Sequence, residues 1–199
     1  MARAPSFAGL ILAAGESTRM GRDKALLPWH GHTLLEAHIE ALQSHTDFVM
    51  VVAGKNCCAL QSVVDAHGAF LTVNPQPEQG QFSSLQVGLQ EVLNRGRDAA
   101  IVALVDHLPV QSETIVRLRR AFEQSPSGIW AAVPECAGTH GHPFVAGREM
   151  MTAFLQAETA SNARAVEHAH QKHIAYVVVD DQNAFANIDT PEDYERITK

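Results

Sequence analysis

A cluster of phosphate-binding residue types occupies the segment from Gly15 to Lys24. It holds two glycines, two hydroxyl side chains, two arginines and one lysine. Glycine lets backbone N–H groups approach an anion closely, and the Arg19 guanidinium and the Lys24 ammonium can neutralise phosphate oxygens. The segment lacks Gly-Lys-Ser, Gly-Lys-Thr and the G-x-G-x-x-G spacing, which excludes a Walker loop and a dinucleotide-binding loop. Composition alone leaves two interpretations: a triphosphate-binding loop or a mobile surface loop.

Two acidic positions could provide hard oxygen ligands for a metal ion. Asp106 follows the apolar run 99–105, and a carboxylate at a strand end suits Mg²⁺, which binds one or two carboxylates together with phosphate oxygens and water. Capping of the helix expected near residue 111 is the alternative, but the intervening His107-Leu108-Pro109 argues against a direct cap. Near the C-terminus, Thr190 can cap a helix opened by Pro191, which leaves Asn187 and Asp189 unexplained.

The segment 74–85 offers a third candidate. Gly80 suits a backbone that closes over a flat ligand, and Ser83 or Ser84 can cap the helix that follows. Plain capping, which needs no ligand, explains the two serines equally well.

Eleven histidines invite a metal site, and His140 and His142 have a spacing that zinc could use. No third ligand stands at a fixed spacing from this pair, which argues against zinc, because catalytic zinc usually has three protein ligands. We expect the histidines at 168, 170 and 173 to lie on different faces of one helix, in solvent.

Apolar patterning predicts the elements that must position these residues. Continuous apolar or β-branched runs predict strands at 7–14, 48–53, 70–73, 99–105, 129–133, 144–146 and 174–179, and helical spacing predicts helices at 34–42, 59–66, 83–93 and 111–122. The alternation indicates an α/β fold with a mostly parallel sheet covered on both faces. Ligands of such sheets bind beyond the carboxyl ends of the strands, which favours the binding-loop interpretation of residues 15–24.

Composition narrows the class of protein further. The 199 residues are 46% hydrophobic and 19% charged, without a repeat or linker, which indicates a single domain spanning 1–199. A formal charge of -7 argues against a broad nucleic-acid surface. Three cysteines without a CxxC pair suit a reducing compartment, and the apolar run 7–14 is too short to span a membrane. We therefore expect a cytoplasmic protein that binds neither nucleic acid nor membrane.

The glycine-rich segment also resembles a known signature. From Leu12 to Lys24 the chain reads L-A-A-G-x-S-x-R-M-G-x-x-K, followed by L-L-P and by G-x-T-L-L ending at Leu35. This pattern resembles the molybdenum cofactor nucleotidyltransferases, part of the nucleotide-diphospho-sugar transferase superfamily, and further landmarks extend the match over nearly the whole chain. The resemblance implies a three-layer αβα, Rossmann-like fold with a mostly parallel mixed sheet.

The resemblance implies roles for individual residues. Arg19, Lys24 and Asp106 would be catalytic, and Asp106 would bind Mg²⁺ together with Asp189, with Asn187 the alternative second ligand. The residues implied to contact the nucleotide are Leu12, Ala13, Ala14, Gly15, Arg19, Lys24, Gly80, Ser84 and Asp106.

The turn after Asp106 differs from the family pattern, whereas a Gly-His-Pro motif further along the chain matches it. The family has Asp-x-Pro after this strand, whereas this chain has Asp106-His107-Leu108-Pro109, which leaves the local turn and the role of His107 open. Gly141-His142-Pro143 matches a family motif on the acceptor side, where His142 would contact the acceptor; a purely structural turn is the alternative.

The implied reaction transfers CMP from CTP to the phosphate of molybdopterin, the molybdenum cofactor, and releases pyrophosphate. Ala14-Gly15 resembles the CTP users of the family, whereas Gly-Gly accompanies GTP use. The alternatives are GTP as donor, another acceptor such as a sugar phosphate, methylerythritol phosphate or choline phosphate, and a non-catalytic nucleotide-binding module. The resemblance also implies partners among molybdoenzymes or cofactor-maturation proteins.

Overall fold

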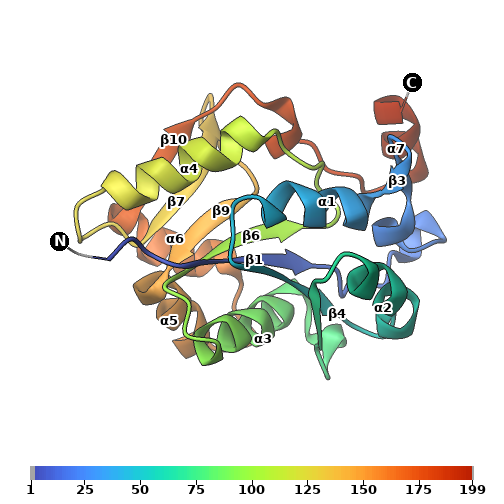
Figure 1. The fold of residues 1–199 in the computed structure, drawn as a ribbon, viewed down its shortest axis with the longest axis horizontal. Coiled ribbons are helices and arrows are strands. Elements are labelled where there is room, and N and C mark those ends of the chain that lie inside the picture. The colour runs from blue at the N-terminus through green and yellow to red at the C-terminus, as the bar shows by residue number, and fades with distance from the viewer. Residues whose placement is uncertain (1–2, 199) are drawn as a thin grey trace.

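A computed structural model describes residues 3–198 of the chain (Figure 1). Positions 1, 2 and 199 of the predicted domain lie outside this range. Eight of the described strands form one mixed sheet in the order β10-β7-β9-β6-β1-β4-β5, with β8 paired to β7. Their bounds are β1 (Phe7–Leu12), β4 (Phe48–Ala53), β5 (Phe70–Val73), β6 (Ala99–Leu104), β7 (Ala131–Cys136), β8 (Thr139–His140), β9 (Phe144–Gly147) and β10 (Ile174–Val178). The short strands β2 (Pro28–Trp29) and β3 (His32–Thr33) form a separate ribbon.

Helices cover both faces of the sheet (Figure 1). One face carries α1 (Leu34–Gln43), α2 (Cys57–Ala66) and α4 (Ser112–Gln124), and the other carries α3 (Gln81–Asn94), α5 (Arg148–Gln156) and α6 (Ala163–Ala169). The C-terminal α7 (Pro191–Thr198) lies at the end of the molecule that β3 also occupies. The predicted α/β fold with a three-layer, mostly parallel mixed sheet is confirmed.

The central strand β1 shows why the chain folds into layers. All six of its residues are buried. Phe7 and Ile11 belong to the core beneath α1, α2 and α4, whereas Leu10 and Leu12 belong to the core beneath α3 and α5. Side chains alternate across a strand, and burial of each large apolar side chain contributes about 1.5–3 kcal/mol. A strand apolar on both faces is therefore stable only between two helical layers.

The order of the strands creates the place where a ligand can bind. The chain runs from β1 outward through β4 to β5 and then returns to the opposite side of β1 as β6. Leu12 and Leu104, the last residues of β1 and β6, are direct neighbours in the parallel register. The segments that follow these two strands diverge there, which opens a crevice at the topological switch point of the sheet.

Some predicted elements differ from the structure. The first strand ends at Leu12, two residues before its predicted end, although the Ala13 amide still donates to the Val52 carbonyl at 2.8 Å. No specific sequence signal predicted α5, which follows β9 directly, or the two-residue strands.

The predicted capping of α3 by Ser83 or Ser84 is wrong. The helix begins at Gln81, and its N-cap is Gly80 at φ 94°, a left-handed conformation that favours glycine. Both serines lie inside the first turn, where each accepts a hydrogen bond from the Asn74 amide group, at 2.8 and 2.9 Å. The serines therefore hold the preceding loop against the helix.

The prediction for the late histidines is wrong in part. His168 lies on α6, but His170 and His173 follow the helix, and the His173 ring stacks on Trp130 with centroids 3.8 Å apart. Within residues 3–198, none of the helices has the length and apolar character needed to cross a membrane.

Candidate active site

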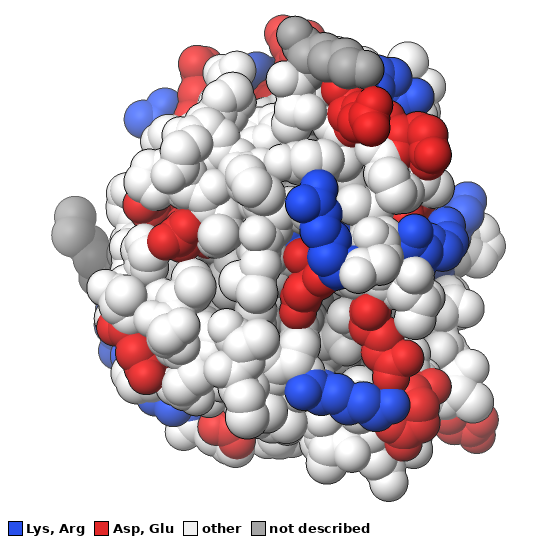
Figure 2. Space-filling view, turned by 90° about the vertical axis from the view of Figure 1, so that its right-hand side faces the viewer, with Lys and Arg blue, Asp and Glu red and all other residues white. Residues whose placement is uncertain are grey.

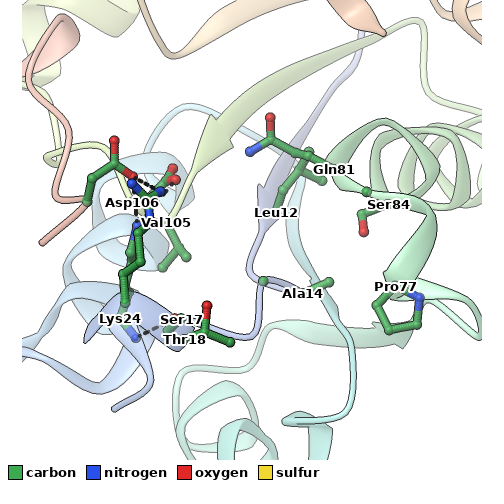
Figure 3. A pocket seen from close by; sticks show the side chains of 14 residues that line it. Leu12, Ala14, Ser17, Thr18, Lys24, Pro77, Gln81, Ser84, Val105 and Asp106 are labelled. Carbon is green, nitrogen blue, oxygen red and sulfur yellow. Dashed lines mark hydrogen bonds and ion pairs between the residues drawn. The ribbon is translucent and has the colours of Figure 1, made fainter. Parts of the chain in front are cut away.

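A pocket of about 270 Å³ lies beyond the carboxyl ends of β1 and β6 (Figure 3). Leu12 and Ala14 lie between its two walls in Figure 3, with Lys24 and Asp106 on one side and the residues of the α3 side opposite. Gly15, Arg19 and Asp189 also line it. We call this space the charged pocket. Figure 2 looks onto this end of the molecule and shows Lys and Arg side chains interspersed with Asp and Glu side chains.

Four charged side chains from three distant segments converge in the charged pocket. Lys24 Nζ lies 3.2 Å from Asp189 Oδ1 and 3.7 Å from Asp106 Oδ2. Arg19 Nη2 lies 3.0 Å from the same Asp189 oxygen. The Lys24 side chain is only 10% exposed, so its ammonium needs these carboxylates, because an unpaired buried charge is costly. The structure thus brings together the residues for which the sequence predicted catalytic and metal-binding roles.

A short backbone bridge fixes the two carboxylates relative to each other. His107 pairs with Asn187 in an antiparallel bridge, and the Ile188 amide donates to the Asp106 carbonyl at 2.7 Å. Asn187 Nδ2 donates to Asp189 Oδ2 at 2.8 Å. Of the two candidates for a second metal ligand, Asp189 therefore meets Lys24 directly, and Asn187 orients the Asp189 carboxylate.

The start of α7 holds Asp189 from the other side. The Asp193 carboxylate accepts hydrogen bonds from the amides of Asp189 and Thr190 at 3.2 and 3.0 Å, and these bonds hold the pKa of Asp193 below its usual value. The Asp193 amide donates in return to Thr190 Oγ1 at 3.2 Å, so the predicted cap by Thr190 is confirmed.

Side-chain hydrogen bonds fasten the glycine-rich loop. Ser17 Oγ accepts from the Lys24 amide at 3.1 Å, and Asp23 accepts from the Ala25 amide at 3.0 Å. Asn56 Nδ2 donates to the Ala13 carbonyl at 2.9 Å and to the Asp23 carboxylate at 2.6 Å. These bonds tie the loop to the end of the strand before it and to the start of α2. They thereby hold the part of the loop that carries Arg19 and Lys24, the side chains that can bind an anion.

Gly15 opens into the charged pocket. A Cβ added there would meet no protein atom within 4 Å, so the protein itself does not require glycine at this position. The free space suits close approach of a ligand to the backbone, which was the expected use of the loop glycines.

The donor set suits a hard divalent cation. Asp106 and Asp189 supply carboxylate oxygens on either side of one point, with room in the pocket for phosphate oxygens and water, the environment that Mg²⁺ prefers. In the described part of the chain no three His, Cys, Asp or Glu side chains cluster as a metal site, which leaves the His140 and His142 pair without a third zinc ligand.

A larger cavity of about 800 Å³ adjoins the charged pocket. The two spaces share Leu12, Gly80 and Gln81 as lining residues. The larger cavity extends from there towards His142 and Phe144 on one side and α6 on the other. The molecule therefore has two neighbouring compartments: a small one lined by charges and a large one of the size that small-molecule sites have.

Comparison with known proteins decides the family. Residues 9–174 match the family described as MobA-like NTP transferase domain. The chain belongs to the MobA-like NTP transferase family. It is 30% identical over 193 residues to a molybdenum cofactor guanylyltransferase of Xanthomonas euvesicatoria, and the alignment covers 95% of this chain and 93% of the relative. It is 24% identical over 186 residues to the molybdenum cofactor cytidylyltransferase of Escherichia coli, with 93% and 92% covered.

The fold agrees with solved structures. Rv0371c of Mycobacterium tuberculosis superimposes with a TM-score of 0.82 at 24% identity, over 96% of this chain and 97% of that one. For this MobA-like NTP transferase, the family relation rests on the sequence match, and the fold agrees with it.

Three histidines lie together behind Asp106 in the MobA-like transferase; His38 is buried, and His107 and His142 are half-buried. The rings of His107 and His142 meet edge to face with centroids 4.8 Å apart, and His38 Nε2 lies 3.0 Å from the His107 carbonyl oxygen. Burial lowers the pKa of His38 to about 4 and that of His142 to about 3 and also lowers the pKa of His107. His142 is therefore neutral near pH 7, so it can contact an acceptor as a hydrogen-bonding wall but brings no positive charge to a phosphate.

Sequence patterns missed several residues that shape the MobA-like site. Asn56 and Asn74 anchor the two loops, and Gln81 lines both compartments. Asn56 and Asn74 each follow a strand closely, which was an available signal, since loops after parallel strands surround the ligand site. Nothing in the spacing of Gln81 distinguishes it from a solvent-facing residue at a helix start.

Proposed function

We propose that this transferase moves a nucleoside monophosphate from an NTP to the phosphate of molybdopterin and releases pyrophosphate, with Mg²⁺ as the metal and CTP as the donor. The observation that carries the proposal is the meeting of Arg19 and Lys24 with Asp106 and Asp189, beside a cavity large enough for the acceptor. A site for binding alone has little need of two convergent carboxylates facing a triphosphate, because they would repel it without a metal.

The chemistry requires positioning more than covalent participation. An oxygen of the acceptor phosphate attacks the α-phosphorus of the NTP, one P–O bond forms, and the bond to the β-phosphate oxygen breaks. A phosphate nucleophile is already ionised near pH 7, so no general base is needed. Arg19 and Lys24 stabilise the charge of the departing pyrophosphate. Mg²⁺, held by Asp106 and Asp189, would neutralise charge that develops on the α-phosphate.

Lys24 has to change partners for this reaction. Its ammonium lies within 3.7 Å of Asp106 and 3.2 Å of Asp189. Arrival of a triphosphate with its cation would give Lys24 new anionic partners and give the carboxylates a divalent ion. The flexible lysine stem permits that exchange, while the carboxylates stay fixed by their backbone bridge.

The proposal of CTP rests on Ala14. This residue lines the charged pocket, and its methyl group occupies space that glycine would leave open. A smaller opening suits a pyrimidine better than a purine. GTP is the second candidate, because the relative at 30% identity is a guanylyltransferase.

Product analysis tests the proposal. Purified protein is incubated with molybdopterin, Mg²⁺ and each of the four NTPs, and the products are analysed by mass for the dinucleotide. The proposal requires the cytosine dinucleotide and an equal amount of pyrophosphate. Formation of the guanine dinucleotide instead would show that GTP, and not CTP, is the donor. Parallel reactions replace molybdopterin by a sugar phosphate, methylerythritol phosphate or choline phosphate, and product from one of these alone would refute the acceptor. CTP binding without any product would refute catalysis.

A further inference from the structure

The larger cavity contains a carboxylate that the proposed reaction does not use. Glu167 of α6 lines it, on the wall away from the charged pocket. The side chain is half-buried, and among residues 3–198 only its burial and the charge of Arg164 are found to act on it, without a hydrogen bond. The nearest charge that acts on it is Arg164, one helical turn earlier, which is exposed.

The surroundings of Glu167 disfavour the ionised form of its carboxyl group. Burial raises the pKa of Glu167 to about 7, because the charged form loses solvation and the exposed Arg164 compensates only in part. Tyr176 of β10 faces it as well, and burial followed by the charges of Glu167 and Glu135 raises the pKa of that hydroxyl. A half-buried acid without a hydrogen-bond donor lowers stability, so a ligand that supplies donors would have a strong partner here.

The walls of the cavity suit a flat heterocycle. Phe82 and Phe144 line one side, and His140, whose ring stacks on Tyr176 at 4.4 Å, lines another. Aromatic side chains favour planar ring systems, which they contact by stacking or edge to face. Glu167 thus adds a carboxylate, a hydrogen-bond acceptor with two oxygens, to a compartment whose other lining residues include aromatic and neutral polar side chains and Arg164.

An ionised carboxylate pairs best with two neighbouring N–H groups, because its two oxygens can each accept one hydrogen bond. A 2-amino-4-oxopyrimidine ring presents such a pair, the ring N3–H and the 2-amino group. We propose that Glu167 binds this edge of the acceptor's pterin ring and so determines which acceptor is used. The inference rests on the proposed function, since it takes a pterin phosphate as the acceptor. It places the pterin in the larger cavity and the phosphate toward the shared residues Leu12, Gly80 and Gln81.

A binding experiment with two matched probes tests the inference without turnover. Intrinsic fluorescence titrations use 6-hydroxymethylpterin and 6-hydroxymethyllumazine, which differ because lumazine carries an oxo group in place of the 2-amino group. The wild-type protein should bind the pterin about 10- to 100-fold more tightly, the range expected for a hydrogen bond to a charged group. Glu167→Gln should abolish that preference, and the exposed Glu158→Gln serves as the control and should retain it.

Steady-state kinetics separates the inference from the proposed function. With molybdopterin, Glu167→Gln should raise the KM of the acceptor about 10- to 100-fold, and the KM of the NTP should stay unchanged. An unchanged acceptor KM, or a pterin preference that persists in the variant, would overturn the role of Glu167 while the transferase activity stands. Wild-type protein that makes no dinucleotide from molybdopterin but uses another phosphate ester would overturn the proposed function as well. Thermal unfolding of Glu167→Gln should show that the variant is folded.

Discussion

Lys24 Nζ lies 3.2 Å from Asp189 Oδ1, although 165 positions separate the two residues in the chain. The contact joins the loop after the first strand to the segment before the last helix, and Asp106, after the sixth strand, faces the same ammonium at 3.7 Å. A monovalent cation of the protein therefore occupies the position between two carboxylates at which our account places a divalent ion.

Removal of the strand-end carboxylate should stop the reaction. Asp106→Ala should lower turnover about 10²-fold or more, the size seen when other electrostatic stabilisers are lost, because the metal loses one of its two carboxylates. The measurement is release of pyrophosphate from CTP with molybdopterin present. The exposed Asp65→Asn is the control and should keep normal turnover. Near-normal release by Asp106→Ala would show that this residue is no metal ligand.

The lysine and the metal should compete for the same carboxylates. In wild-type protein, Mg²⁺ alone should raise the Tm only slightly, because Lys24 already neutralises both acids. In Lys24→Ala the two carboxylates are left without this partner, so Mg²⁺ should raise the Tm more than in the wild type.

The control for that experiment is Lys172→Ala. Lys172 is exposed and does not line the charged pocket, so this variant should respond to Mg²⁺ as the wild type does. An identical response of Lys24→Ala and wild type would contradict competition at this site.

The layers and the site could be predicted to different extents. Continuous apolar runs such as 99–105 predicted the buried strands, because a strand covered on both faces has no polar side. The convergence of Lys24 with Asp189 could not come from periodicity, since it depends on the backbone bridge between His107 and Asn187. It was expected only because the sequence resembles a family.

The predictions of local structure were wrong where tertiary contacts outweigh the local preference of a residue. Ser83 and Ser84 have good capping side chains, yet both bond to the buried Asn74, and Gly80 is the N-cap instead. The stacking of His173 on Trp130 likewise joins residues 43 positions apart, which no helical pattern reveals.

Nucleotide preference should respond to the size of the residue at position 14. Ala14→Gly should raise kcat/KM for GTP relative to CTP, by about tenfold, because removal of one methyl group is worth about 1 kcal/mol or more of discrimination in a closed pocket. The measurement is competition between CTP and GTP for one acceptor. Ala137→Gly, outside the charged pocket, is the control. An unchanged ratio of kcat/KM for GTP and CTP would show that Ala14 does not select the base.

The stability effect of Glu167 should depend on pH with a defined sign. Its pKa is raised from 4.5 to about 7, so between these values the folded state retains a proton that the unfolded state has lost, and stability falls as pH rises through this window. Glutamine does not titrate. Glu167→Gln should therefore gain Tm relative to wild type on going from about pH 5 to about pH 8. A Tm difference that is equal at both pH values would show that burial of this carboxyl has no such cost.

The central claim is that Asp106 and Asp189 become metal ligands when a nucleotide binds. Anomalous diffraction from crystals grown with Mn²⁺ and a non-hydrolysable CTP analogue tests it directly. The account predicts one anomalous peak at about 2.0–2.3 Å from an oxygen of each carboxylate, with Lys24 Nζ moved onto the phosphates. A peak elsewhere, or a Lys24 that stays between the two carboxylates while nucleotide is bound, would contradict it.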